Sequence, residues 1–134
     1  MNTRDGDRLH GLLTAALVSD LAMSFAEVVE ADHVGTLAEP QAIAGHSPDV
    51  VAKTDETLII GEAKLAPRVD DRSFVERLRA WHEYLPAGFQ RTILTLAVPA
   101  GTREPAEAAA ETAGWDHEHL RVLEVGLPQR VAVG

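Results

Sequence analysis

Residues Pro48 to Lys64, PDVVAKTDETLIIGEAK, carry the clearest structural signal in the sequence. Two runs rich in β-branched and aliphatic residues, 49–53 and 57–65, lie on either side of the polar segment 54–56. Short apolar runs separated by a polar turn of this length are typical of a β-hairpin. We therefore expect two antiparallel strands here.

The register of this hairpin brings two acidic side chains together. With the turn centred on Asp55 and Glu56, the numbers of facing residues sum to 111, so Asp49 lies opposite Glu62. Facing residues have Cβ atoms roughly 4.5–5.5 Å apart. Two carboxylates about 4 Å apart repel by about 4 kcal/mol at a surface-like dielectric constant, so we expect a cation between them. Lys64 shares the face of Glu62, because strand side chains alternate.

A divalent metal ion fits this arrangement better than a lysine does, since Mg²⁺ takes converging oxygen ligands. Asp49, Glu62 and the main-chain carbonyl of Ala63 are the predicted ligands of Mg²⁺ or Mn²⁺. Lys64 is then placed to orient or deprotonate a water, or to stabilise charge on a phosphate under attack. The predicted reaction is hydrolysis of a phosphodiester.

The sequence around the hairpin predicts an α/β domain with a mixed sheet flanked by helices. Apolar residues recur at helical spacing before and after the hairpin, and the second helix opens with a capping-box pattern, Ser73 and Glu76. Consecutive strands separated by helices require parallel pairing, whereas the hairpin is antiparallel. The predicted order is α-β-β-β-α-β-α-β, with a helix over 7–24, a strand or helix extension over 25–31, a loop over 35–48, the hairpin, a helix over 73–85, a strand over 92–98, a helix over 104–113 and a strand over 120–125.

Pro48-Asp49, the hairpin and then Glu62-Ala63-Lys64 together resemble the PD-(D/E)XK motif of the restriction-endonuclease-like nucleases. The common core of that superfamily is helix, three strands, helix, strand, which is similar to the order predicted over 7–98. Small single-domain members, such as Holliday junction resolvases, have a comparable size. The resemblance implies that Asp49 and Glu62 bind metal and that Lys64 is the catalytic lysine.

Many members of this superfamily also carry an acidic residue on the first helix. Four residues of this chain are candidates for that position, and the sequence does not choose among them: Asp7, Asp20, Glu27 and Glu30. Two DNA strands need two active sites and one chain supplies one, so a nuclease of this kind is expected to act as a homodimer or with a partner protein.

Composition limits the possible functions. The chain has 134 residues, 46% hydrophobic and 25% charged, which fits one globular domain over 1–134. It has no cysteine, which excludes disulfides and thiolate chemistry. No apolar run approaches the roughly 20 residues that span a bilayer, and the start lacks a signal-peptide pattern, so we expect a cytoplasmic protein without a membrane partner.

The net charge of −9 disfavours long-range attraction of nucleic acid. Segment 64–91 reverses this balance with six bases against four acids. Its arginines are either phosphate contacts or a solvated helix face, and we expect them near Lys64: Arg68, Arg72, Arg77 and Arg79.

Other polar and aromatic residues carry weaker signals. His117 and His119 alternate as metal ligands on a strand would, but a polar loop is the favoured interpretation. His46 is either an exposed loop residue or a neighbour of Asp49, and His10 and His33 receive no role. A helical stripe of Trp81, Tyr84 and Leu85 is interpreted as core or a dimer face.

Three functions remain open at this point. The first is a metal-dependent nuclease acting on DNA or RNA. The second is a non-catalytic module of the same fold that binds another protein, which the acidic surface favours. The third is a phosphoesterase for a smaller substrate, for which negative charge is less of a handicap.

Overall fold

A computed structural model gives the fold, and it describes residues 3–24, 28–31, 40–65, 69, 71–84 and 89–127. The elements, in chain order, are α1 (Thr3–Ser24), β1 (Val28–Ala31), β2 (Val50–Lys53), β3 (Thr57–Ala63), α2 (Arg72–Glu83), β4 (Arg91–Pro99), α3 (Arg103–Thr112), the 3₁₀ turn η2 (His117–His119) and β5 (Leu120–Val125).

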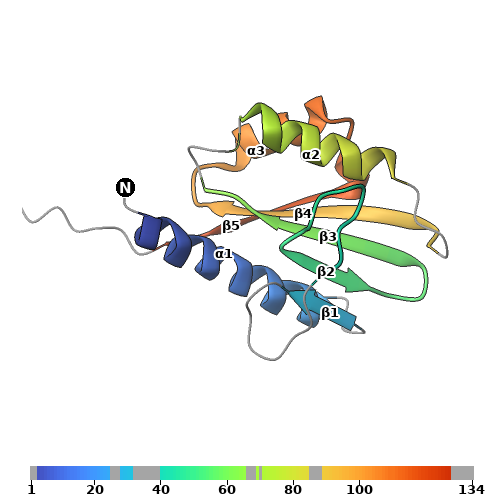
Figure 1. The fold of residues 1–134 in the computed structure, drawn as a ribbon, viewed down its shortest axis with the longest axis horizontal. Helices are drawn as coiled ribbons and strands as arrows, with labels where there is room; N and C mark the ends of the chain where they lie inside the picture. Colours follow the sequence, from blue (N-terminus) through green and yellow to red (C-terminus); the bar gives the residue numbers. More distant parts are fainter. Residues whose placement is uncertain are drawn as a thin grey trace, which may run out of the picture.

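The strands form one mixed sheet in the order β1-β2-β3-β4-β5. The pairs β1–β2 and β2–β3 are antiparallel, whereas β3–β4 and β4–β5 are parallel. Helix α1 covers one face of the sheet, and α2 and α3 cover the other (Figure 1). The predicted α/β class and mixed, helix-flanked sheet are confirmed.

The hairpin has the predicted register. Val50 pairs with Gly61 and Val51 with Ile60, so facing residues sum to 111. The turn is stabilised by Thr54, whose hydroxyl accepts hydrogen bonds from the backbone N–H groups of Glu56 (3.3 Å) and Thr57 (3.0 Å). This local side-chain to backbone bonding is the reason a threonine favours a turn at this position.

Glycine at position 61 lets α1 and β2 pack closely on β3. A Cβ atom there would lie 3.1 Å from the Cβ of Val50 and 3.4 Å from Cδ1 of Leu21. Leu21 belongs to the buried stripe of α1, together with Leu13 and Leu17. Burying each such leucine contributes about 1.5–3 kcal/mol, so this stripe anchors α1 to the sheet.

The opposite face carries the larger core. Leu58 and Ile60 of β3 and Leu94, Leu96 and Val98 of β4 point towards the two covering helices. The residues that meet them from α2, α3 and the segment after α3 are Phe74, Leu78, Trp81, Ala106, Ala109, Ala110 and Trp115. Alternation along β3 therefore places Leu58, Ile60 and Glu62 on one face and Ile59 and Ala63 on the other.

Several element ends differ from the predictions. Helix α2 begins at Arg72, and Asp71 at its N-cap makes no side-chain capping bond. The predicted capping box is wrong because Ser73 already lies inside the helix and the carboxylate of Glu76 pairs with Arg72 Nε at 3.0 Å. Strand β3 ends at Ala63, two residues earlier than predicted.

Two predicted segments are only partly described. The segment predicted as strand or helix extension contains β1, and residues 25–27 lie outside the described residues. In the predicted loop 35–48, residues 40–48 are described and include a small turn closed by Ile43 and His46.

Candidate functional site

Asp49 and Glu62 meet at the end of the hairpin, as the register predicts. Asp49 directly precedes β2, and Glu62 lies next to the end of β3. The register that pairs Val50 with Gly61 continues to Asp49 opposite Glu62, and each carboxyl group shifts the pKa of the other. The two residues therefore lie at the same end of the hairpin.

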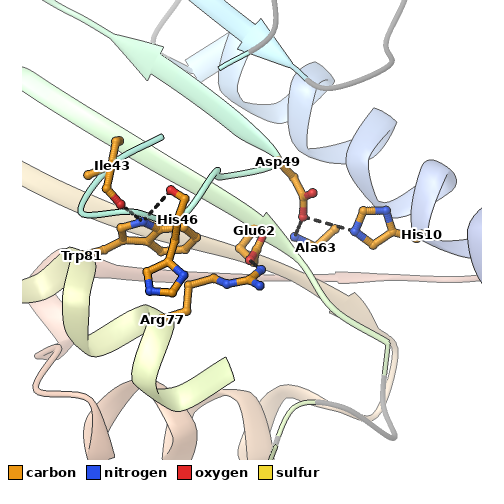
Figure 2. A network of polar contacts seen from close by, with 8 residues as sticks. All are labelled: His10, Ile43, His46, Asp49, Glu62, Ala63, Arg77 and Trp81. Atoms are coloured by element: carbon orange, nitrogen blue, oxygen red, sulfur yellow. Dashed lines mark hydrogen bonds and ion pairs between the residues drawn. The ribbon is translucent and has the colours of Figure 1, made fainter. Parts of the chain in front are cut away.

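Asp49 accepts two hydrogen bonds from groups on α1 and β3. Its Oδ2 lies 3.2 Å from His10 Nε2 and 2.9 Å from the backbone nitrogen of Ala63, which donates to it (Figure 2). Burial alone would raise the pKa of Asp49, but the contacts with Glu62, His10 and Ala63 lower that pKa to about 2. Asp49 is therefore held as an anion over the whole physiological range.

Glu62 has the opposite electrostatic character. Its side chain is 2% exposed, and its Oε2 accepts a hydrogen bond from Arg77 Nη1 at 2.7 Å. Burial, followed by the contact with Asp49, raises the pKa of Glu62 well above its ordinary value, although Arg77 opposes the shift. The pair thus combines a strong and a weak acid, which is the usual behaviour of two carboxyl groups that share one buried site.

The chain supplies cations on the two outer sides of this pair. Arg77, on α2, approaches Glu62, and His10, on α1, approaches Asp49 from the other face of the sheet (Figure 2). The hydrogen bond to Asp49 is the main reason that the pKa of His10 is raised. Part of the expected repulsion between the carboxylates is therefore offset by the protein itself.

Lys64 lies beside the carboxyl pair without an ion pair to either acid among the described contacts. Its Nζ is 5.2 Å from the centre of the Phe74 ring, and its backbone nitrogen donates to the carbonyl of Ala97. The positive charge of Lys64 lowers the pKa of His10, so the ammonium group is close enough to affect the cluster. A cation over an aromatic ring is held by the negative face of the ring.

Trp81 fixes the loop that leads to Asp49. The indole Nε1 donates to the carbonyls of Ile43 (3.0 Å) and His46 (3.3 Å), which close a two-residue turn (Figure 2). The two central residues, Ala44 and Gly45, have φ values of 51° and 81°. Trp81 and Arg77 are one helical turn apart on α2, so one helix face positions both Glu62 and the approach to Asp49.

His10 has no predicted role, although the sequence contains a signal for one. His10 precedes Leu13, Leu17 and Leu21 at the spacing of the buried face of α1, so a helical wheel points it towards the sheet. Its partner, Asp49, is 39 residues away in the chain. Only the packing of α1 on the sheet brings them together.

The four arginines of the basic segment have different positions. Arg77 joins the carboxyl pair, whereas Arg72 pairs with Glu76 and Arg79 donates to the carbonyl of Thr112. Arg68 lies outside the described residues. Only Arg77 is therefore placed at the candidate site within the described part of the chain.

Of the four candidates for an acidic residue on the first helix, only Asp20 has a described side chain, and it does not lie at the site. Asp20 pairs with Arg121 of β5 at 2.8 Å. The side chains of Asp7, Glu27 and Glu30 lie outside the described residues. His10 occupies the place on the first helix that faces Asp49.

The histidines near the last strand have separate partners. His117 lies 3.1 Å from Glu111, and His119 lies 2.7 Å from Asp116. Among the residues that the structure describes, no three His, Asp or Glu side chains are grouped so as to hold a metal ion. The segment before β5, which the sequence predicts to be a polar loop, forms the 3₁₀ turn η2.

No protein-family model, curated protein or solved structure matches this chain. In the described residues, none of the helices has the length and apolar character that crossing a membrane requires.

Proposed function

We propose that this chain is a metal-dependent nuclease that hydrolyses phosphodiester bonds of DNA or RNA. The observation that supports it most strongly is the position of Asp49 opposite Glu62 in the hairpin register, with Lys64 two residues further along. This arrangement comes from the hairpin register and places two acids and a lysine at one end of the sheet. It is also the arrangement that the resemblance to the restriction-endonuclease-like nucleases implies.

The donor set fits a hard divalent cation. Asp49 is anionic. The raised pKa of Glu62 favours a proton on its carboxyl group, and a bound cation would displace that proton. Carboxylate oxygens are the ligands that Mg²⁺ and Mn²⁺ prefer. Asp49 and Glu62 would hold the ion together with the carbonyl of Ala63, and the bound ion would supply Lewis-acid stabilisation of charge.

The neighbouring residues of the chain have distinct roles in this proposal. Lys64 orients or activates the attacking water. The water oxygen bonds to phosphorus, the bond to the leaving ester oxygen breaks and the water proton ends on that oxygen. The products are a phosphomonoester and a hydroxyl.

Arg77 is placed to contact the phosphate group of the substrate. Its side chain is 34% exposed, so the guanidinium extends from buried Glu62 to the surface. The exposed part of a guanidinium is suited to a phosphate oxygen.

The second candidate function is a non-catalytic module that binds a protein partner. Arg77 and His10 already contact the two carboxyl groups, so the cluster is compensated without a metal ion. The net charge of −9 also favours a basic protein partner over nucleic acid.

Cleavage assays distinguish the two functions. The purified protein is incubated with plasmid, single-stranded DNA, branched DNA and RNA in Mg²⁺ or Mn²⁺, with EDTA as a control. We expect cleavage of at least one substrate that requires metal and is lost in Lys64→Ala. Lys53→Ala, on the neighbouring strand, is the matched control and should retain activity. Absence of cleavage of every substrate by the folded protein would contradict the nuclease proposal and favour the binding module.

A further inference from the structure

A cavity of about 210 Å³ lies at the end of the sheet away from Asp49 and Glu62. Its lining includes Arg91 at the start of β4, which pairs with Thr57 at the start of β3. Glu62 follows Thr57 by five residues, which is about 16 Å along an extended strand. The cavity is therefore a separate place from the proposed catalytic site.

Aromatic side chains are concentrated around this cavity. The chain has two Trp, one Tyr and three Phe, and three of these six line it: Tyr84, Phe89 and Trp115. Trp115 is 4% exposed, and its Nε1 donates to the carbonyl of Leu78 at 2.9 Å, so its ring is fixed. Tyr84 is 43% exposed and forms an accessible part of the lining.

A glycine at position 114 keeps one wall of the cavity in place. Gly114 has a φ of +108°, and a Cβ atom there would lie 2.9 Å from Nδ1 of His82. The imidazole of His82 can therefore pack edge-on against Trp115, with ring centres 5.2 Å apart and planes at 71°. The wall is thus formed by two rings in a defined arrangement.

Polar groups in the cavity provide one oriented cation. Arg91 Nε donates to the hydroxyl of Thr57 at 3.1 Å, and its Nη atoms have no hydrogen-bond partner within the described part of the chain. His119 also lines the cavity, and its Nδ1 pairs with Asp116 Oδ1 at 2.7 Å, leaving Nε2 for a ligand. A guanidinium that is held through Nε, with both Nη groups available as donors, is suited to bidentate binding of a phosphate.

We infer that this cavity binds a mononucleotide, with its base against the aromatic rings and its phosphate on Arg91. The volume is below the roughly 300 Å³ of sites for drug-sized ligands, so the cavity encloses the base alone, and the ribose and phosphate extend from it along Arg91. Stacking on aromatic rings tolerates any base, because every base has a π-face. The mononucleotide is either free or the terminal residue of a strand, since both present the same chemistry. The inference does not depend on the proposed catalytic activity.

Nuclear magnetic resonance of the full chain tests this inference with adenosine 5′-monophosphate as the probe. The two tryptophans provide one indole N–H signal at the cavity, from Trp115, and one away from it, from Trp81. We expect the nucleotide to shift the Trp115 signal and leave the Trp81 signal unchanged. Adenosine lacks the phosphate and ribose 5-phosphate lacks the base, so each should bind at least about tenfold more weakly than the nucleotide.

Variants at the cavity separate specific binding from general attraction. Arg91→Gln should weaken nucleotide binding about tenfold or more. Tyr84→Leu, at an exposed position, should weaken it without affecting the fold. Arg72→Gln, on the surface of α2, is the matched control and should bind like the unaltered chain.

A 5′-phosphorylated trinucleotide distinguishes the two sources of the ligand. Tighter binding than the free mononucleotide assigns the cavity to strand ends, and weaker binding assigns it to the free nucleotide. No shift of Trp115 at millimolar nucleotide would overturn the inference, as would equal binding by Arg91→Gln and Arg72→Gln. Because all these measurements are binding measurements, their outcome is independent of cleavage activity.

Discussion

At the scale of single residues, His10 and Asp49 make the stability of the protein depend on pH at both ends of the range. The pKa of His10 is raised, so its contribution is fully present below its ordinary pKa of 6.5 and is lost as the pH rises through the folded value. The pKa of Asp49 is lowered from 3.8 to about 2, so its contribution is lost as the pH falls between these values.

We therefore expect His10→Ala to lower the free energy of unfolding most near pH 5, where His10 is protonated and Asp49 is ionised. The side chain of His10 is 42% exposed, so solvent screening limits the effect to below about 1 kcal/mol. Urea unfolding from pH 3 to pH 9 measures it. Ser19→Ala, at an exposed position on the same helix, should give an offset that does not change with pH. The same flat profile for His10→Ala would show that the pair contributes nothing.

Arg77 lowers the cost of burying Glu62, and its removal is predicted to be destabilising. In Arg77→Ala the pKa of Glu62 should rise further, because burial and Asp49 both raise that pKa and the guanidinium that lowers it is gone. We expect a loss of about 1–3 kcal/mol at pH values where Glu62 is ionised, the usual result of removing one partner of a buried charged hydrogen bond. The loss should shrink as the pH falls through the raised pKa of Glu62, because protonated Glu62 needs no counter-ion.

Carboxyl-carbon NMR and urea unfolding measure these two effects. Arg79→Ala, on the same helix but bonded to the carbonyl of Thr112, is the control and should leave the titration of Glu62 unchanged. An unchanged Glu62 titration in Arg77→Ala would contradict the assignment of Arg77 as its counter-ion.

Residue-scale prediction from the sequence succeeded where the relevant contacts are local. Asp49 and Glu62 lie on two strands joined by one turn, so the register alone specifies their proximity. The role of Arg77 and that of His10 depend on how α2 and α1 lie across the sheet, which no local pattern contains. The same reason explains why Lys64 and a metal ion, rather than Arg77 and His10, were expected to offset the two carboxylates.

At the scale of elements, the packing of α1 against β2 and β3 is limited by one glycine. Gly61→Ala places a Cβ atom 3.1 Å from Val50 and 3.4 Å from Leu21. We expect it to reduce the free energy of unfolding by about 1–3 kcal/mol, since close-packed cores do not accept added volume easily. Gly11→Ala is the matched substitution, because nothing lies within 4 Å of its added Cβ. It should instead stabilise α1 by about 0.5–1 kcal/mol.

Chemical unfolding of the two variants gives both values. Equal effects of the two substitutions would contradict the close approach of α1 to the hairpin. Loss of metal-dependent cleavage in Gly61→Ala alone would show that this packing also positions the carboxyl pair.

Element positions followed from the sequence more closely than element ends did. Each strand and helix has an apolar pattern of its own, so its existence is a local property. The ends depend on competing side-chain partners, as when Glu76 pairs with Arg72 rather than capping the helix at Ser73. The 3₁₀ turn η2, in a segment predicted to be a loop, is stabilised by Asp116, which accepts a hydrogen bond from the backbone nitrogen of His119.

At the scale of the whole molecule, Glu62 lies near the carboxyl end of β3, beside the parallel strand β4. The carboxyl ends of parallel strands are the usual location of ligand sites in open α/β sheets. The inferred nucleotide cavity lies at the opposite end. The two proposals therefore assign different ends of one sheet to different ligands.

The acidic surface predicts a weak dependence of nucleic-acid affinity on salt. With a net charge of −9, and with Arg77 and Lys64 the only Lys or Arg side chains placed at the candidate site within the described residues, few phosphates are neutralised. We expect the logarithm of the association constant for duplex DNA to fall with a slope of about −1 to −3 against the logarithm of salt concentration. Fluorescence anisotropy on the unaltered chain in EDTA, where the substrate should not be consumed, measures this slope. A slope steeper than about −6 would indicate an extended basic face instead.

Calorimetric titration with Mg²⁺ and with Mn²⁺, in two buffers of different ionisation enthalpy, tests most directly whether Asp49 and Glu62 form a divalent-cation site. Because the pKa of Glu62 is raised, binding should release a proton, which the difference between the buffers reports. We predict one binding site that is lost in Glu62→Gln and retained in Glu76→Gln. No binding at millimolar metal, or equal binding by Glu62→Gln and the unaltered chain, would contradict the site.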